Sequence, residues 1–197
     1  MDQNHLKMPE KADISQTKEK ILYGTSCFWE LSKWIIVLVI LFTMAHFFVA
    51  TLFIVDGVSM EPNYHSGEYI IVNRWQYLFG KPERGDTVVL KFPGDPENKK
   101  YIKRIIGLPG ENVIVQEGSV FINGQKLDEK YLPSDTQTLP NVNRTLREDD
   151  FFLLGDNRAN SSDSRVWGVA NRQHLIGSAW VVLYPFETFG IVPKALY

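Results

Sequence analysis

Hydrophobic residues form one long run near the N-terminus and many short runs after it. The long run is WIIVLVILFTMAHFFVATLFIV, residues 34–55, which contains no Asp, Glu, Lys or Arg. As a helix rising 1.5 Å per residue, it would be about 33 Å long, enough to cross a hydrocarbon core of roughly 30 Å. The alternative is a helix buried in a protein core, but such helices rarely stay uncharged for so long. The pattern therefore predicts a membrane-spanning helix.

The residues around this run indicate an anchor that is not cleaved. A secretory signal is shorter and ends in a small-x-small cleavage site, which the exit sequence VATLFIVDG lacks. Lys18, Lys20 and Lys33 lie shortly before the run, whereas the first basic residue after it is Arg74. Because basic residues stay on the cytoplasmic side, we expect a single-pass protein of the cell membrane with three parts. These are a cytoplasmic N-terminal tail (1–33), a transmembrane signal anchor (34–55) and an extracytoplasmic domain (56–197).

The short runs that follow are rich in β-branched and aromatic residues and are separated by Gly, Pro and Asn. Asn123-Gly124 predicts a tight hairpin, because both residue types tolerate positive φ. Residues 128–148 are polar and predict a loop. The expected fold class is mainly β, with one transmembrane helix followed by an all-β sandwich or barrel. Strands are predicted at 68–72, 86–92, 100–106, 112–116, 119–122, 151–154 and 178–185.

Composition narrows the possible functions. A net charge of −2 and a pI near 6.1 provide no basic surface for nucleic acid, so we expect no nucleic-acid partner. The single cysteine excludes a disulfide within the chain and any metal site built from several cysteines. The four histidines lack metal-ligand spacing, so we expect neither a metal nor another cofactor. A serine–histidine–aspartate triad would need His65 or His174, and neither stands in a recognisable motif.

Four stretches could carry chemistry, although each also has an ordinary interpretation as a turn, a loop or a surface strand. They are GVSMEP (57–62), RGDTVVLKFP (84–93), YIKRIIGLPGE (101–111) and GDNRANSSDSRVWG (155–168).

Lys103 lies in a predicted strand, where an apolar environment would change the pKa of its amine. Alternate strand residues share a face, so Lys103 would lie between Tyr101 and Ile105 on a partly apolar surface. Desolvation lowers the pKa of a lysine from about 10.4, by several units when burial is complete. A neutral amine can then act as general base toward a serine hydroxyl without any histidine.

In this order and spacing, the stretches resemble the motifs of the bacterial type I signal peptidase (leader peptidase) family, in its small single-span form. SMEP is similar to that family's Ser-Met-x-Pro nucleophile motif, and YIKRIIGLPGE is similar to its lysine motif. GDNRANSSDSRVWG is similar to its Gly-Asp-Asn…Ser-x-Asp-Ser-Arg motif. The resemblance covers residues from about 34 to 191, anchor included.

The resemblance implies a role for each matching residue. Ser59 would be the nucleophile and Lys103 its general base, with the Ser59 N–H contributing to an oxyanion hole. Ser161 would orient the Lys103 amine by a hydrogen bond. The supporting residues would be Asp163 with Arg165 and Asp156 with Arg104, and the substrate pockets would be walled by Val55, Met60, Tyr64, Tyr101 and Ile102.

The resemblance also implies a substrate and a membrane setting. The partners would be the lipid bilayer and signal-peptide-bearing preproteins, cleaved after small residues by an all-β catalytic domain through an acyl-enzyme. An anchor so close to Ser59 would hold enzyme and substrate in one plane and raise their effective concentration. The aromatic runs 75–79 and 184–189 either contact the membrane interface or fill a β core.

One departure from the family and two other functions stay open. Gly57 stands where some members carry Ser or Thr as the second oxyanion donor, so the sequence leaves that donor unidentified. A self-cleaving repressor peptidase shares the β fold and the serine–lysine dyad, but it carries a DNA-binding domain in place of an anchor. A membrane-anchored, non-catalytic binding module on the same scaffold is the other alternative.

Overall fold

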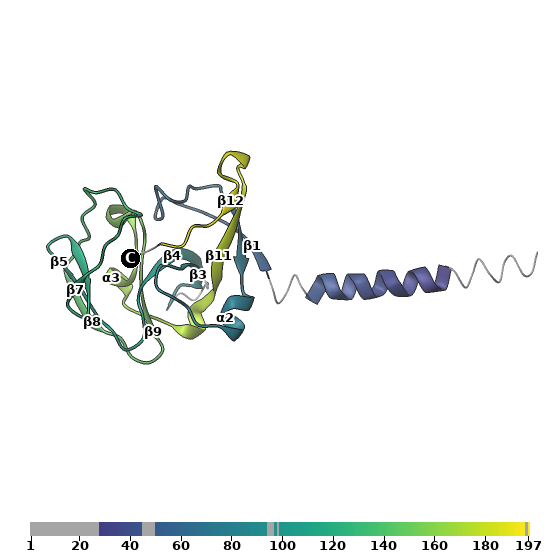
Figure 1. Ribbon diagram of the computed structural model, residues 1–197, viewed down its shortest axis with the longest axis horizontal. Helices are drawn as coiled ribbons and strands as arrows, with labels where there is room; N and C mark the ends of the chain where they lie inside the picture. Colours follow the sequence, from purple (N-terminus) through teal and green to yellow (C-terminus); the bar gives the residue numbers. More distant parts are fainter. Residues whose placement is uncertain (1–27, 45–49, 94–96, 98, 196) are drawn as a thin grey trace, which may run out of the picture. The chain divides into compact units, whose positions relative to one another are not determined.

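The computed structural model describes residues 28–44, 50–93, 97, 99–195 and 197, and it forms two units, residues 1–45 and 46–197 (Figure 1). In the first unit, residues 28–44 are helical. Within the described part of the chain, no helix has both the length and the apolar composition needed to cross a membrane. Of the predicted tail, only residues 28–33 are described, and they belong to this helix rather than to a separate segment.

The single helix predicted over 34–55 is wrong at its C-terminal end. Ala50–Ile54 is strand β1, which pairs antiparallel with β2 (Tyr69–Asn73). A continuous apolar run does not distinguish a helix from a buried strand, and here a neighbouring strand supplies the backbone partners. The intervening residues 45–49 lie outside the described ranges.

The second unit consists of two antiparallel sheets. The larger sheet has the strand order β1-β2-β11-β3-β4-β9-β10, with β12 paired to β11, and the smaller has the order β7-β6-β5-β8. The remaining strands of the larger sheet are β3 (Thr87–Lys91), β4 (Lys100–Gly107), β9 (Asp150–Leu154), β10 (Ala170–Asn171), β11 (Leu175–Tyr184) and β12 (Gly190–Ile191). The smaller sheet contains β5 (Asn112–Gln116), β6 (Ser119–Ile122), β7 (Gln125–Lys126) and β8 (Val142–Thr145).

Short helices occupy several of the connections between strands. They are α2 (Trp75–Phe79), α3 (Ser164–Trp167) and the 3₁₀ turns η1 (Arg158–Asn160), η2 (Arg172–His174) and η3 (Phe186–Thr188).

The mainly β fold class and all seven predicted strands are confirmed, within a few residues at their ends. The hairpin is confirmed as well, because Asn123 (φ 49°) and Gly124 (φ 83°) both adopt the left-handed conformation between β6 and β7. The loop predicted over 128–148 is wrong at β8, whose polar sequence VNRT pairs with the edge of β5. A polar strand at a sheet edge gives no hydrophobic alternation to recognise.

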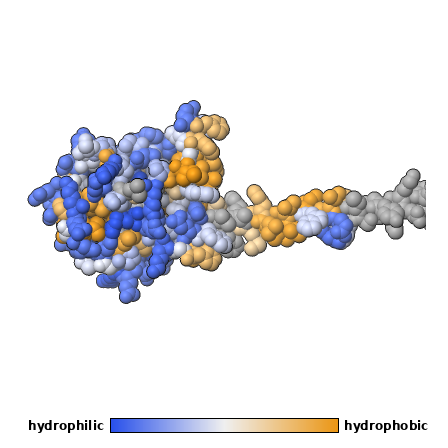
Figure 2. All heavy atoms as spheres, in the orientation of Figure 1, coloured by the Kyte–Doolittle hydropathy of each residue, from blue (hydrophilic) through white to orange (hydrophobic). Residues whose placement is uncertain are grey.

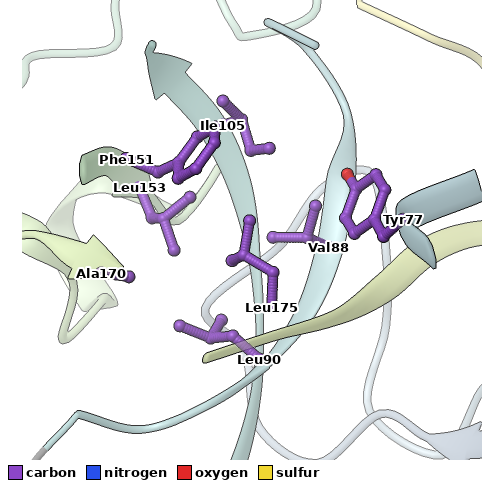
Figure 3. Packing of buried hydrophobic residues seen from close by; sticks show 8 residues of the cluster. All are labelled: Tyr77, Val88, Leu90, Ile105, Phe151, Leu153, Ala170 and Leu175. Carbon is purple, nitrogen blue, oxygen red and sulfur yellow. The ribbon is translucent and has the colours of Figure 1, made fainter. Parts of the chain in front are cut away.

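Strand β4 lies between β3 and β9 and is buried from Ile102 to Gly107. Its successive side chains point to opposite faces and enter different cores. Ile105 joins the cluster of Figure 3, which also contains Val88 of β3 and Leu153 of β9. Ile106 joins a second cluster that the smaller sheet completes through Val113. The two cores therefore hold β4, and with it residue 103, from both sides.

Gly107, at the end of β4, provides a test of this packing. A Cβ atom there would lie 2.5 Å from Val113 Cγ2 and 2.8 Å from Leu146 Cδ1. We expect Gly107→Ala to lower the free energy of unfolding by about 1–3 kcal/mol, because the second core has no room for it. Denaturant unfolding of the purified protein measures this change.

Gly190→Ala is the matched control, since a Cβ atom at Gly190 meets nothing within 4 Å. If both variants unfold at the same denaturant concentration as the unmodified protein, the close packing around Gly107 is wrong.

Candidate active site

Ser59 lies in a tight turn that packs on a third hydrophobic cluster, whose members include Val55, Met60 and Ile102. Glu61 N donates to Val58 O (3.2 Å) and Tyr64 N donates to Met60 O (3.0 Å), which closes the turn. The Met60 side chain is fully buried directly after the half-buried Ser59. This cluster therefore fixes the backbone while the serine side chain stays accessible.

The Lys103 amine reaches this serine from β4. Its Nζ donates to Ser59 Oγ at 2.8 Å and to the carbonyl oxygen of Ile102 at 2.9 Å. The whole lysine is only 2% exposed, and its Nζ lies 5.3 Å from the centroid of the Tyr101 ring. A lysine and a serine 44 positions apart in the chain thus share one dry site.

Burial lowers the pKa of Lys103 to about 8, because removing the amine from water penalises its charged form. The negative charges of Asp163 and Asp156 act in the opposite direction, with smaller effect. Each of these carboxylates is paired with an arginine, as described next. The amine is therefore readily deprotonated near neutral to mildly alkaline pH.

Arg104 and Asp156 form a buried ion pair with two hydrogen bonds. Arg104 Nε donates to Asp156 Oδ1 (2.8 Å) and its second terminal nitrogen to Oδ2 (2.6 Å). Arg104 also donates to Gly85 O (2.9 Å), and its guanidinium lies 4.4 Å from the centroid of the Tyr131 ring. Asn63 Nδ2 donates to Asp156 Oδ2 (2.9 Å). These bonds fasten the loop that begins at Gly155 to β4 and to the turn carrying Ser59.

Asp163 and Arg165 form a second buried pair within the same loop. Arg165 Nε donates to Asp163 Oδ1 (2.8 Å) and a terminal nitrogen donates to Oδ2 (2.7 Å). Asp163 is also the N-cap of α3, since its side chain accepts from Arg165 N, and it accepts from Gly155 N (3.1 Å). The pair therefore joins the two ends of the loop.

Ser161 lies close to the site but does not make the hydrogen bond expected of it. Its buried Oγ has no hydrogen-bond partner among the described residues, so the predicted bond to the Lys103 amine is not present. A Cβ atom on Gly155 would lie 2.1 Å from Ser161 Oγ and 2.5 Å from Ser59 O. The loop can approach the serine turn this closely only because residue 155 is a glycine.

Four of the five predicted pocket residues come together and one does not. Val55, Met60, Tyr64 and Ile102 belong to the buried cluster under the serine turn. Tyr101 packs instead against the cluster of Figure 3, with its ring centroid 5.1 Å from that of Phe92. The strand alternation explains the difference, because Tyr101 and Ile102 point to opposite faces of β4.

Gly57 adopts a φ of 93° two residues before Ser59, and its N–H donates to Ser66 Oγ (3.2 Å). A Cβ atom at this position would meet nothing within 4 Å. The Gly57 N–H thus already has a partner, and there is open space where a side-chain donor would stand.

Several residues that connect this site carry little or no signal in the sequence. Asn157 and Arg158 lie inside the GDNR stretch without a predicted role, although both bond to segments outside their own loop. Asn63 links the serine turn to Asp156, and Glu129 pairs with Arg158 from the distant loop over 128–140. The position of Asn157 and Arg158 within a Gly/Asp/Asn loop is the one available clue.

The arrangement provides a hydroxyl and a desolvated amine within one hydrogen bond of each other, which is the requirement for a serine activated by a lysine base. Among the described residues, no three His, Cys, Asp or Glu side chains gather closely enough to hold a metal ion.

The chain is similar to known signal peptidases over most of its length. The family model described as "Signal peptidase, peptidase S26" matches residues 28–184. A signal peptidase I of Bacillus amyloliquefaciens is 35% identical over 182 residues, covering 87% of this chain and 93% of its own. A signal peptidase I of Leptolyngbya laminosa is 42% identical over 151 residues, covering 73% of each chain. A crystal structure of a signal peptidase I from Enterococcus faecalis matches with a TM-score of 0.44 at 30% identity, over 50% of this chain and 96% of that one.

The family model spans well over half of the chain, and the two relatives are similar over most of their own length. The motifs around Ser59, Lys103 and Asp156 all lie within the matched segment. This chain therefore belongs to the signal peptidase I family of the S26 peptidases.

Proposed function

We propose that this protein removes signal peptides from exported preproteins by a serine–lysine mechanism, with Ser59 as nucleophile and Lys103 as general base. One observation supports this most directly. The amine of Lys103 lies 2.8 Å from Ser59 Oγ in a position where the lysine is 2% exposed. A non-catalytic binding module would have no need to bury a lysine beside a serine, and the described residues offer no other use for it.

The chemical steps follow from this geometry. The neutral Lys103 amine accepts the Ser59 hydroxyl proton as Oγ attacks the scissile carbonyl carbon. The resulting tetrahedral oxyanion accepts a hydrogen bond from the Ser59 N–H. When the carbon–nitrogen bond breaks, the lysine returns its proton to the departing amine of the mature chain. The Lys103 amine then takes a proton from a water molecule as the water oxygen attacks the ester carbonyl carbon. When the ester bond breaks, Lys103 returns this proton to Ser59 Oγ and the signal peptide leaves as a carboxylic acid.

Supporting roles go to the residues that hold these two groups in place. Arg104 with Asp156 and Arg165 with Asp163 keep the loop over 155–165 against β4 and the serine turn. Ser161 Oγ, which lacks a partner among the described residues, faces no competing hydrogen bond and is available to the Lys103 amine in the substrate complex. In our proposal it therefore orients the amine during the reaction rather than in the free enzyme.

The edge of the larger sheet provides a place for the substrate. Among the described strands, β1 pairs with β2 alone, so its outer edge can accept an extended peptide as an additional strand. Val55, Met60 and Ile102 lie beyond the end of this edge, next to the serine. We propose that these buried side chains leave room for little more than a methyl group, which explains a preference for alanine-sized residues. Tyr64 belongs to the same cluster, whereas the Tyr101 ring lies beside the Lys103 amine.

The membrane setting is also part of the proposal. The apolar segment over 34–49 would anchor the chain in the cell membrane, with the N-terminus in the cytoplasm and the β domain outside. The β domain itself exposes large apolar side chains along β1, β11, β12 and the η3 turn between β11 and β12, where hydrophobic residues gather in Figure 2. They include Leu52, Ile54, Trp180, Tyr184, Phe186, Phe189 and Ile191.

Most of the side chains in the two aromatic runs lie at the surface, although Tyr77 belongs to the core of Figure 3. In the run over 75–79, Tyr77 is buried but Trp75, Leu78 and Phe79 are exposed. In the run over 184–189, all three aromatic side chains are more than half exposed. Exposed aromatic residues of this kind are typical of surfaces that meet the membrane interface.

The dyad predicts the outcome of two substitutions. Ser59→Ala removes the nucleophile and Lys103→Met removes the base, so each should lower preprotein cleavage at least about 10⁴-fold. Circular dichroism should show both variants folded, because methionine fills the volume of the buried Lys103 side chain and Ser59 is only half-buried. Cleavage of a detergent-solubilised preprotein, followed by gel electrophoresis, measures the loss.

Ser134→Ala and Lys126→Met are the matched controls, since both residues are exposed and lie outside the motif stretches. We expect them to retain full activity. Cleavage by folded Ser59→Ala or Lys103→Met at a rate near that of the unmodified enzyme would disprove the mechanism.

The lowered pKa of Lys103 predicts the pH dependence of catalysis. The amine is a base only when neutral, so kcat/KM should rise about tenfold per pH unit below a midpoint near 8 and level off above it. A pH series from about 5 to 10 with a peptide substrate measures this profile. A flat profile would exclude a lysine base.

The lowered pKa of Lys103 also predicts how the free energy of unfolding depends on pH. The pKa is lower in the folded state, so the unfolded chain binds more protons between about pH 8 and 10.5 and stability rises with pH there. Lys103→Met should remove this rise, which serves as a control that the burial of Lys103 causes both effects.

The proposed anchor predicts where the protein resides. The full chain should stay with the membrane fraction after a high-salt wash, and protease added outside spheroplasts should degrade the β domain but spare an N-terminal tag. Val39→Asp combined with Leu41→Asp should release the chain from the membrane, because each charge costs several kcal/mol in hydrocarbon.

Ser32→Asp, at a polar position of the same helical segment, is the control and should not release it. Recovery of the unmodified chain in the soluble fraction would contradict the anchor.

A further inference from the structure

A buried arginine fastens the loop over 128–140 to the loop that begins at Gly155. Arg158 is 4% exposed and donates to Glu129 Oε2 (3.0 Å), Glu129 Oε1 (2.5 Å) and Thr138 Oγ1 (2.6 Å). It also donates to the hydroxyl oxygen of Tyr131 (3.0 Å). Glu129 is itself mostly buried, with 13% of its side chain exposed. Arg158 and Glu129, here called the Arg158–Glu129 pair, thus form a further buried arginine–carboxylate pair beside the two already described.

The pair fixes the backbone of the Gly155 loop from inside. Arg158 Nε donates to Gly155 O (3.0 Å), which closes the turn over 155–158. Asn157 lies within this turn, and its Oδ1 accepts from Asn160 N (3.3 Å). Arg158 therefore determines where Asn157 stands without touching Ser59.

Asn157 makes two hydrogen bonds to the serine turn. Its backbone N donates to Ser59 O (3.0 Å) and its Nδ2 donates to Val58 O (3.1 Å). The two carbonyl oxygens that flank the nucleophile are thus held by one residue. Both bonds join segments almost a hundred positions apart in the sequence.

The bond to Val58 O has a specific geometric consequence. The carbonyl of Val58 and the N–H of Ser59 belong to the same peptide unit, which is planar and has the two groups on opposite sides. Fixing the direction of Val58 O therefore fixes the direction of the Ser59 N–H. Under the proposed function, that N–H is the group that meets the oxyanion.

We propose that Asn157 is a positioning residue that aims the Ser59 N–H at the oxyanion, and that the Arg158–Glu129 pair holds Asn157 in place. This inference rests on the proposed function, in which Ser59 is the nucleophile. It assigns a part in catalysis to Glu129, a residue of a loop that carries none of the recognised motifs. The oxyanion donor is then controlled from the loop over 128–140.

The test compares two isosteric variants with a charge-matched control. Asn157→Asp keeps the acceptor for Asn160 N but places an oxygen against Val58 O, and Glu129→Gln removes the charge that Arg158 binds. We expect kcat to fall about 100-fold for Asn157→Asp and about tenfold for Glu129→Gln, with KM within about twofold. Asp128→Asn changes the same charge on the neighbouring residue, whose ion pair with Lys130 is exposed, and should leave kcat unchanged.

Inhibitor binding separates a positioning role from a loss of folded protein. A peptide aldehyde forms a tetrahedral adduct with an oxyanion at the serine, whereas an uncleavable signal peptide binds without one. Affinity for the aldehyde should fall in step with kcat in both variants, while the affinity for the uncleavable peptide stays unchanged. Equal losses for both ligands, or none for either, would overturn the proposal.

A double variant tests whether Glu129 acts through Asn157. If it does, Asn157→Asp combined with Glu129→Gln should lose no more activity than Asn157→Asp alone, because the second change has nothing further to displace. Losses that multiply would overturn the connection between the two residues. Should Asn157→Asp not fold, the aldehyde comparison on Glu129→Gln tests the positioning role by itself, with the same two outcomes.

Ser59→Ala distinguishes the failure of this inference from the failure of the proposed function. If folded Ser59→Ala is active, Ser59 is not the nucleophile and both proposals are refuted. An inactive Ser59→Ala together with an unaffected Asn157→Asp would refute the positioning role alone.

Discussion

The site depends on keeping one lysine out of water without giving it a carboxylate partner. Lys103 is buried as deeply as the core leucines, yet its amine contacts a serine hydroxyl and a backbone carbonyl. An ion pair would satisfy a buried ammonium but would also hold it protonated, which would remove the base. Both carboxylates that act on Lys103, Asp156 and Asp163, are instead occupied by arginines. The ion pairs around the site thus have an electrostatic role in addition to a structural one.

The β4 strand explains how one short segment can serve both needs. Alternation sends Lys103 toward Ser59 and the next residue, Arg104, to the opposite face, where it binds Asp156. Residues farther along the strand enter two hydrophobic cores, so the strand cannot shift toward solvent without exposing both. The proposed base Lys103 and Arg104, which binds the neighbouring loop, are therefore positioned by the same backbone, and the distance between them is set by strand geometry.

Features of the fold and of the site could be predicted from the sequence where they depend on residues close together in the chain. The seven predicted strands and the Asn123-Gly124 hairpin are encoded by neighbouring residues, and both are predictable. The end of the apolar run is not predictable, because Ala50–Ile54 is as apolar as the residues before it. It becomes a strand through pairing with Tyr69–Asn73. Ordered motifs are enough to group Ser59 with Lys103. The free hydroxyl of Ser161 and the separation of Tyr101 from the other pocket residues depend on side-chain directions that no spacing encodes.

The contacts least visible in the sequence are those between loops. Glu129 and Arg158 are 29 positions apart, and Asn157 and Val58 are 99 apart, with no periodicity to connect either pair. Such contacts still matter, because an oxyanion donor must be aimed before the charge develops if it is to lower the barrier. Within the serine turn itself, Val58 O accepts a hydrogen bond from Glu61 N at 3.2 Å. Asn157 adds a second hydrogen bond to Val58 O and also binds Ser59 O, and in our proposal the buried Arg158–Glu129 pair keeps Asn157 in place.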